Sequence, residues 1–142
     1  MATAQHDQYI ELAIGEENYA IKIEDIHEII KMQAVTDIPN SRHYVKGVIN
    51  LRGKVVPIIS LRNLFGLPDE AFTKATRIVV VKHREESIGI IVDQVNKVTR
   101  YPDIQPPPDR IGGISGAYFL GIGIHDQHLV GILKLDEVLL RD

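Results

Sequence analysis

Short apolar runs rich in Ile and Val recur along the chain at intervals of about ten residues, with turn-forming residues between them. β-Branched side chains fit a pleated, half-buried surface, so each run predicts a strand. Many short strands at this spacing are typical of small barrels or a sandwich. The predicted strands cover residues 9–14, 19–23, 45–49, 55–59, 77–82, 87–92, 119–124 and 129–133.

Three further segments predict interruptions of this β pattern. In Glu24–Ile30, acidic residues come before apolar ones, which favours a short helical turn that runs into a strand. Leu61–Gly66 predicts a helical turn that Gly66 ends. Pro106–Pro108 predicts an extended loop, because each proline ring fixes φ and removes a hydrogen-bond donor.

The sequence also indicates an internal duplication. The segment that begins at Tyr19 can be aligned with the one that begins at Ile88, an offset of 69 residues (88 − 19). The segment that begins at Gly47 can be aligned with the one that begins at Gly121, an offset of 74 residues (121 − 47). Apolar positions match apolar positions in both blocks and turns match turns, although any two Ile/Val-rich strands align to some degree. We therefore predict two similar β units.

Each such unit would be small, with little core of its own, so we expect the two units to pack through an apolar seam. The surface beside the seam would be a groove with sheet edges, which suits a partner helix or strand. The predicted domain covers residues 8–140, with lobes at about 8–75 and 76–140, and the prediction allows a strand to be exchanged between them. Residues 1–7 are expected to be flexible.

Composition narrows the classes of function. The chain has 142 residues, a formal net charge of −3 and no cysteine, which excludes disulfides and Cys-based zinc sites and argues against an electrostatic grip on nucleic acid. The N-terminus does not have the pattern of a signal peptide. No apolar run approaches the ~20 residues that span a bilayer. These features predict a soluble intracellular protein.

Three motifs in order resemble the CheW domain family. Tyr44–Gly66 resembles its signature, with the sequence YVKGVINLRGKVVPIISLRNLFG, except that Ser60 stands where the family usually has Asp. Ile88–Val98 resembles a second family strand, and Tyr9–Ile30 resembles the family's opening pattern. The resemblance extends from about Tyr9 to Leu140.

The resemblance implies an all-β fold of two pseudo-symmetric five-stranded SH3-like barrels, packed through a shared hydrophobic core, with one or two short helical turns. It implies a chemotaxis adaptor without enzymatic activity or cofactor, located in the cytoplasm and recruited to membrane receptor arrays. Its partners would be the regulatory domain of the histidine kinase CheA and the cytoplasmic tip of methyl-accepting chemoreceptors. No binding to nucleic acid and no direct membrane insertion are expected.

Arg52 is the first candidate for a contact residue. It lies in a predicted tight turn, where a guanidinium offers a planar fork of donors to carboxylates or carbonyls of a partner. The alternative is an intramolecular salt bridge to a loop acid. With the resemblance, the expected kinase-binding residues are Lys46, Gly47, Val48, Asn50 and Arg52.

A second candidate surface begins on the strand after Glu24. Ile26, Glu28 and Ile30 alternate, so they would share one face of an extended strand, and an apolar face with one carboxylate is normal for an interface. Alternatively, the two isoleucines are core and Glu28 is solvated. The resemblance implies receptor docking here, with residues of the second lobe on the other wall. The expected receptor-binding residues are Ile26, Glu28, Ile30, Val35, Gly89, Ile90 and Val98.

Other functions find less support in the sequence. His125 and His128 are expected to flank a hairpin loop, and a zinc site would need further ligands, so no metal site is predicted. An enzyme would have Asp93, His125 and Asp126 as its only plausible reagents, and no pattern arranges them. The leading alternative is a small-barrel nucleic-acid-binding protein, but aromatic residues are only 6% and do not alternate with basic ones.

Overall fold

A computed structural model describes residues 7–39, 41–111 and 113–139. The chain forms two units, each built around its own β-sheet. The central unit is Asp25–Val95, and the terminal unit combines the described residues before Asp25 with the described residues after Val95. Among the described residues, no helix has the length and apolar character needed to cross a membrane.

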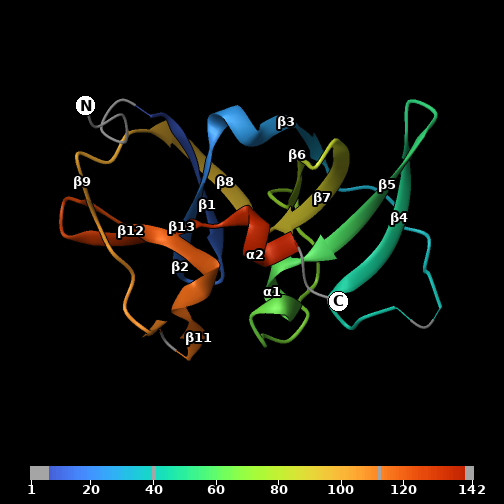
Figure 1. Ribbon diagram of the computed structural model, residues 1–142. Coiled ribbons are helices and arrows are strands. Elements are labelled where there is room, and N and C mark those ends of the chain that lie inside the picture. Colours follow the sequence, from blue (N-terminus) through green and yellow to red (C-terminus); the bar gives the residue numbers. More distant parts are fainter. Residues whose placement is uncertain (1–6, 40, 112, 140–142) are drawn as a thin grey trace. The chain divides into compact units, whose positions relative to one another are not determined.

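The central unit contains a five-stranded sheet in the order β3-β6-β7-β5-β4, in which only β5 and β7 are parallel (Figure 1). A 3-10 turn at Ile23–Asp25 leads into β3, as predicted for this segment. Side chains that alternate along the strands form the core of the unit, which contains Ile49, Val56, Ile58, Ile78, Val80 and Ile91. The strands are β3 (Ile26–Lys31), β4 (Val45–Leu51), β5 (Lys54–Ser60), β6 (Arg77–His83) and β7 (Glu86–Val92).

Helix α1 (Leu61–Leu64) follows β5 directly, and Ser60, the last residue of β5, is its N-cap. The Ser60 hydroxyl accepts a hydrogen bond from the backbone N–H of Asn63 at 3.1 Å, and this N–H has no partner within the first turn of the helix. Gly66, with φ of 81°, ends the turn as predicted. Ser and Asp are comparable N-caps, so the departure from the family pattern at this position keeps the same local chemistry.

The segment after β3 completes the barrel of the central unit. Thr36 bridges to Val48 on the edge strand β4, with both backbone hydrogen bonds at 2.9 Å. Gly47 makes this possible: its φ is 140°, and a Cβ atom there would lie 2.0 Å from the Thr36 carbonyl oxygen. Only glycine allows the two backbones to approach this closely.

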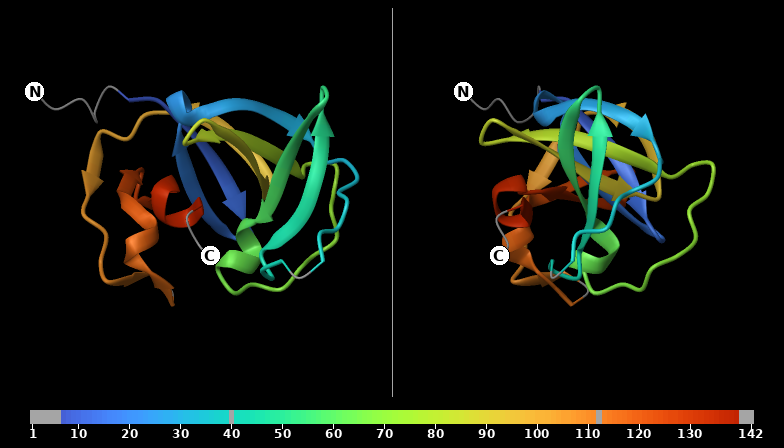
Figure 2. Two further views of the ribbon diagram at one scale, coloured as in Figure 1. Left: turned by 45° about the vertical axis from the view of Figure 1, so that its right-hand side comes forward. Right: turned by 90° about the vertical axis from the view of Figure 1, so that its right-hand side faces the viewer.

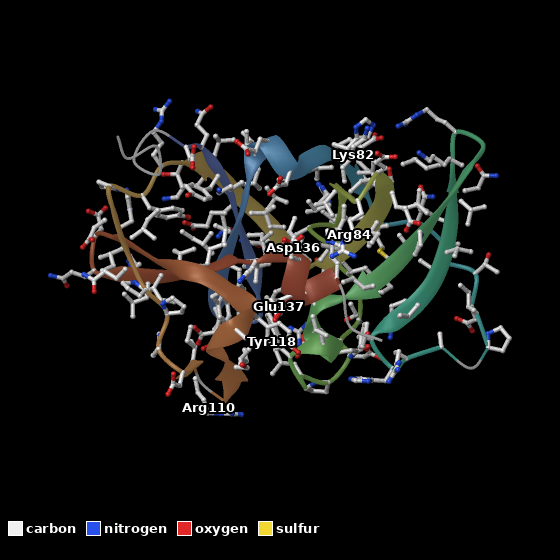
Figure 3. The ribbon with its side chains drawn as sticks, viewed as in Figure 1. Lys82, Arg84, Arg110, Tyr118, Asp136 and Glu137 are labelled. Atoms are coloured by element: carbon white, nitrogen blue, oxygen red, sulfur yellow. The ribbon has the colours of Figure 1, made fainter. Side chains whose placement is uncertain are left out.

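The terminal unit contains a six-stranded sheet in the order β8-β1-β2-β13-β12-β9. Its strands are β1 (Tyr9–Ile14), β2 (Glu17–Lys22), β8 (Gln94–Thr99), β9 (Asp103–Gln105), β12 (Phe119–His125) and β13 (His128–Leu133). β10 (Arg110–Ile111) and β11 (Ile114–Ser115) form a separate hairpin, followed by a 3-10 turn at Gly116–Tyr118. Asp136 and Glu137 lie in the first turn of α2 (Leu135–Leu139) (Figure 3).

A buried carboxylate joins three segments of the terminal unit. Glu11 on β1 accepts a hydrogen bond from the Tyr101 hydroxyl at 2.8 Å and another from the Asn96 amide on β8 at 3.2 Å. Burial and this hydrogen bond to Glu11 raise the pKa of Tyr101. The surrounding apolar cluster consists of Tyr9, Ala20, Tyr101, Val130 and Ile132.

The register of the strands confirms the predicted duplication. The parallel pair Ile58↔Gly89 of the central unit corresponds to Ile132↔Ala20 of the terminal unit. These residues are related by the two offsets read from the sequence, 74 (132 − 58) and 69 (89 − 20). Each unit also has a bulge at the start of the equivalent strand, before Gly47 and before Gly121.

The division of the chain differs from the expected lobes at 8–75 and 76–140. The N-terminal hairpin β1–β2 belongs to the sheet of the C-terminal strands, through the parallel pairing of β2 with β13. β6 and β7, expected in the second lobe, complete the central unit instead (Figure 2). β9 adds a sixth strand to the sheet of the terminal unit, where the prediction had five.

Candidate docking surfaces of the central unit

The β4–β5 hairpin ends in a two-residue turn formed by Arg52 and Gly53, between the paired residues Leu51 and Lys54. Both turn residues have left-handed backbone angles, with φ of 54° and 85°. This geometry matches the twist of the strands and is uncommon for a side chain as large as arginine. The Asn50 side chain accepts a hydrogen bond from the Gly53 amide at 2.8 Å. The turn therefore holds the Arg52 side chain at the end of the unit.

Arg52 forms an ion pair with Glu28 on β3. The Arg52 side chain is 66% exposed and that of Glu28 23% exposed. His27 lies beside them, with 3.8 Å between its Nε2 atom and the Glu28 carboxylate. From the sequence, Arg52 was expected to bind the kinase and Glu28 the receptor, whereas in the structure the two side chains are in contact. The acid that binds Arg52 lies on a strand and not in a loop.

A bulge in β3 changes the predicted orientation of Ile26. Glu28 pairs with Val80 and Ile30 pairs with Ile78, whose side chains face the core. Ile26 pairs with Val81, so an extra residue of β3 lies between Ile26 and Glu28. Directly paired residues point to the same side of a sheet, so Ile26 faces away from the other two. The expectation that Ile26, Glu28 and Ile30 share one face was wrong in this respect.

The other predicted kinase-binding residues lie along β4, away from its tip. Lys46 is near the start of the strand, where its ammonium group donates to Asn63 and to the Asp69 carboxylate, both at 3.1 Å. The hydrogen bond from Lys46 lowers the pKa of Asp69. Gly47 is buried against Thr36, and Val48 is half-buried. Asn50 and Arg52 are thus the exposed members of this set.

Two predicted receptor-binding residues, Gly89 and Ile90, occupy interior positions, and a third, Val35, is half-buried. Gly89 is a packing glycine of β7, since a Cβ atom there would lie 2.6 Å from a methyl group of Ile58. Ile90 is fully buried. Both lie in the central unit and not in a second lobe, so they do not form the opposite wall that the sequence suggested. Val35 packs against the core of the central unit.

Val98 is the member of this set that lies in the terminal unit. It is exposed on β8, the edge strand of that unit's sheet. It therefore remains an accessible candidate contact residue.

The sequence prediction missed the apolar side of the hairpin. Val55 is 65% exposed on β5, directly opposite Asn50. Pro57 is half-buried opposite Val48, on the same side of the hairpin because it lies two residues along the strand. The alternation of Val55, Val56, Pro57 and Ile58 carries this signal, because only one of its two sides can face the core. An exposed valine next to a fixed polar tip suits a protein interface.

Arg62 and Asp93 form an ion pair within the central unit. Arg62 donates to both carboxylate oxygens of Asp93, at 3.1 and 2.7 Å, and this hydrogen bonding raises the pKa of Arg62. Asp93, a reagent in the enzyme alternative, is therefore held in an ion pair.

His125 and His128 of the terminal unit pair directly across the β12–β13 hairpin, as expected. Within the described residues, no group of three or more His, Cys, Asp or Glu side chains could hold a metal ion.

Comparison with known proteins gives consistent matches over the chain. Residues 8–142 match the CheW-like domain. The chain is 41% identical over 137 residues to the chemotaxis protein CheW of Helicobacter pylori, covering 95% of this chain and 82% of that protein. It is 31% identical to CheW of Bacillus subtilis, covering 96% and 88%. The crystal structure of the scaffolding protein TtCheW from Thermoanaerobacter tengcongensis superposes with a TM-score of 0.88 at 33% identity, covering 96% of this chain and 89% of that one.

Proposed function

The chain belongs to the CheW-like domain family, and on this premise we propose that it is a chemotaxis adaptor that couples chemoreceptors to the histidine kinase CheA. It acts by protein–protein contacts alone, without catalysis or cofactor. Its place of action is the cytoplasm, at membrane receptor arrays. Relatives whose names record chemotaxis support this role, as does the similarity to a solved scaffolding protein.

One observation in the structure carries the proposal most directly: the rigid, exposed end of the β4–β5 hairpin. Arg52 and Asn50 supply polar contacts there, and the neighbouring Val55 supplies exposed apolar surface. Arginine beside apolar side chains is typical of the residues that dominate protein interfaces. Because the turn is fixed by the Gly53–Asn50 hydrogen bond and by Glu28, little entropy is lost when a partner binds.

We assign this hairpin to the kinase regulatory domain, with Asn50, Arg52 and Val55 as direct contacts. Lys46, Gly47 and Val48 support it, since they position β4 through Asp69 and Thr36. We assign strand β3, with Ile26, Glu28 and Ile30, to the receptor tip, together with Val35 of the same unit. Val98 of the terminal unit is a separate candidate for a receptor contact. The buried positions Gly89 and Ile90 would act by shaping β7 and not by contact.

The Arg52–Glu28 pair connects the two assigned surfaces within one unit. A partner that offers a carboxylate to Arg52 would compete with Glu28, and a partner that offers a cation to Glu28 would compete with Arg52. A receptor can change the kinase only if its contacts with the adaptor differ between signalling states. Exchange of partners at this ion pair would provide such a difference.

A binding experiment tests the proposal. Tagged CheA regulatory domain is used to capture the chain, with and without a receptor cytoplasmic tip, while circular dichroism verifies that the chain is folded. We expect binary capture and stronger ternary capture. A folded wild-type chain that is captured by neither partner would refute the adaptor role.

A further inference from the structure

Glu11 is a buried carboxylate in the terminal unit. It is only 7% exposed, and it lies on β1, a strand whose residues are all buried. Tyr9 and Glu11 are two residues apart, so their side chains lie on the same face of the strand, and Tyr9 belongs to the apolar cluster of this unit. A charged group in such a place carries a desolvation cost that only well-formed hydrogen bonds offset.

The central unit has an apolar residue at the equivalent position. The offset of 69 residues that relates the two units makes Val80 the counterpart of Glu11 (80 − 11) and Met32 the counterpart of Tyr101 (101 − 32). Val80 belongs to the core cluster of the central unit, and Met32 packs against that cluster. Apolar side chains therefore suffice at these two positions, so the fold alone does not require the hydrogen bond between Glu11 and Tyr101.

The two oxygens of the Glu11 carboxylate bind two different points of the segment 96–101. The Tyr101 hydroxyl donates to Oε1 at 2.8 Å, and the Asn96 side-chain amide donates to Oε2 at 3.2 Å. Tyr101 follows β8 by two residues and is fully buried. The same amide nitrogen of Asn96 lies 3.2 Å from the side-chain oxygen of Asn18 on β2. One carboxylate thus holds both ends of this segment.

The residues between these two anchors have little apolar packing of their own. Lys97, Val98 and Arg100 are exposed, and β8 is an edge strand with β1 as its neighbour in the sheet (Figure 1). Asn96 and Val98 are two residues apart, so they lie on the same face of β8. An exposed edge strand with few buried side chains opens easily. The position of Val98 therefore depends on the hydrogen bonds at the two ends of the segment.

We propose that Glu11 is a positioning residue, whose carboxylate fixes the segment from Asn96 to Tyr101 and thereby holds Val98 in the orientation that a receptor tip binds. Glu11 is buried, so it acts through β8 and not by contact with the receptor. This role rests on the proposed receptor contact at Val98. The charge serves the placement of one exposed segment, which is why its counterpart in the central unit can be the apolar Val80.

Amide hydrogen exchange of the complete chain tests the first half of this proposal. The double variant Glu11→Val/Tyr101→Phe removes both partners of the buried hydrogen bond together, so the melting temperature should change little. We expect the amides of β8 to exchange at least about tenfold faster than in the wild type, while those of β12 keep their protection. Asn96→Ala, at an exposed position, should have a smaller effect in the same direction.

Binding assays test the second half, with a receptor tip and the CheA regulatory domain measured separately. The double variant should bind the receptor tip about tenfold more weakly, because β8 is no longer preorganised. Its affinity for the kinase domain should stay within about twofold, because the β4–β5 hairpin lies in the central unit. In a Val98→Ala background the double substitution should cause no further loss, since Glu11 acts through Val98.

Ser115→Ala is the matched control, because it removes a hydrogen bond to the Ala117 amide in the same unit and should change neither β8 exchange nor receptor binding. Unchanged β8 exchange or unchanged receptor affinity in the folded double variant would overturn the positioning role. If the double variant does not fold, the same two readouts on Asn96→Ala decide. A wild-type chain that binds no receptor tip would refute the proposed function and this role of Val98, whereas the exchange rates report on Glu11 and β8 separately.

Discussion

The Arg52 guanidinium at the tip of the β4–β5 hairpin forms an ion pair with the Glu28 carboxylate on β3. The two residues are 24 positions apart in the sequence (52 − 28), and neither strand of the hairpin that carries Arg52 is a neighbour of β3 in the sheet. Because Arg52 is largely exposed, the pair contributes little to the free energy of unfolding. Its main consequence is to fix the orientation of two side chains that a partner can reach.

Loss of either member of this pair is expected to affect assembly more than stability. Arg52→Ala or Glu28→Lys should weaken the ternary complex with CheA regulatory domain and receptor tip, while the unfolding free energy changes by about 1 kcal/mol or less. Co-sedimentation and chemical denaturation measure the two effects. Lys134→Ala, which removes an exposed cation of the terminal unit, is the control and should leave assembly intact. Unfolding caused by either substitution would show that the residue is structural.

Gly47 and Gly53 provide a contrast between two left-handed glycines. Gly47→Ala should cost on the order of 3 kcal/mol, because the new Cβ would displace the Thr36 backbone and open the barrel. Gly53→Ala should cost only about 1 kcal/mol, the strain of the left-handed turn, since no atom lies within 4 Å of the added carbon. Urea denaturation of both variants measures the difference. Equal costs would exclude the Thr36 contact as the reason for glycine at position 47.

Ser60 offers a test of helix capping at the position where the family usually has Asp. Ser60→Ala should lower the unfolding free energy by about 1 kcal/mol, because the Asn63 amide loses its acceptor. Ser60→Asp should lower it less, since a carboxylate also caps the first turn. If thermal denaturation ranks the alanine variant at or above the aspartate variant, the hydroxyl is not acting as a cap.

The buried tyrosines of the terminal unit predict instability at alkaline pH. Burial raises the pKa of Tyr19 to about 12, and burial also raises the pKa values of Tyr9 and Tyr101 above the ordinary 10.0. A folded-state pKa that lies above the unfolded value means that the phenols ionise more readily when unfolded. Their contribution to stability is complete below pH 10 and is lost as the pH rises through the folded-state values.

Tyrosinate absorbance during alkaline titration measures this effect, and ionisation should coincide with unfolding. Tyr101→Phe removes one of the three phenols and should make the alkaline loss of stability less steep. It should also cost about 1–3 kcal/mol at neutral pH, because buried Glu11 loses a donor. A variant with an unchanged alkaline slope would contradict the assignment.

Most of the long strands, their turns and the duplication could be predicted because they depend on local periodicity, whereas the short strands β9, β10 and β11 were missed. Alternating Ile and Val mark pleated strands, and the two offsets pair equivalent residues such as Ile58 and Ile132. The exchange of the β1–β2 hairpin into the C-terminal sheet could not be predicted with confidence, because it depends on which distant edge a strand meets. No local pattern encodes that choice.

The part of the candidate site that depends on local sequence was predicted, and the part that depends on contacts between strands was not. The Arg-Gly turn is a local signal, so Arg52 was found at the tip of a hairpin. Its pairing with Glu28 and the bulge that turns Ile26 away both depend on cross-strand register, which requires knowledge of the neighbouring strand. Val55 was missed because valine in a strand is normally taken as core.

The terminal unit is assembled from both ends of the described chain, and this has a consequence for biosynthesis. Of the described strands, β1 and β2 leave the ribosome first, yet the edge of β2 pairs with β13, more than one hundred residues later. The central unit has all its strands by Val92 and can close while the C-terminal strands are still being made. The first hairpin to be translated therefore waits with an open edge until the last strand arrives, which makes nascent chains most vulnerable to mispairing at β2.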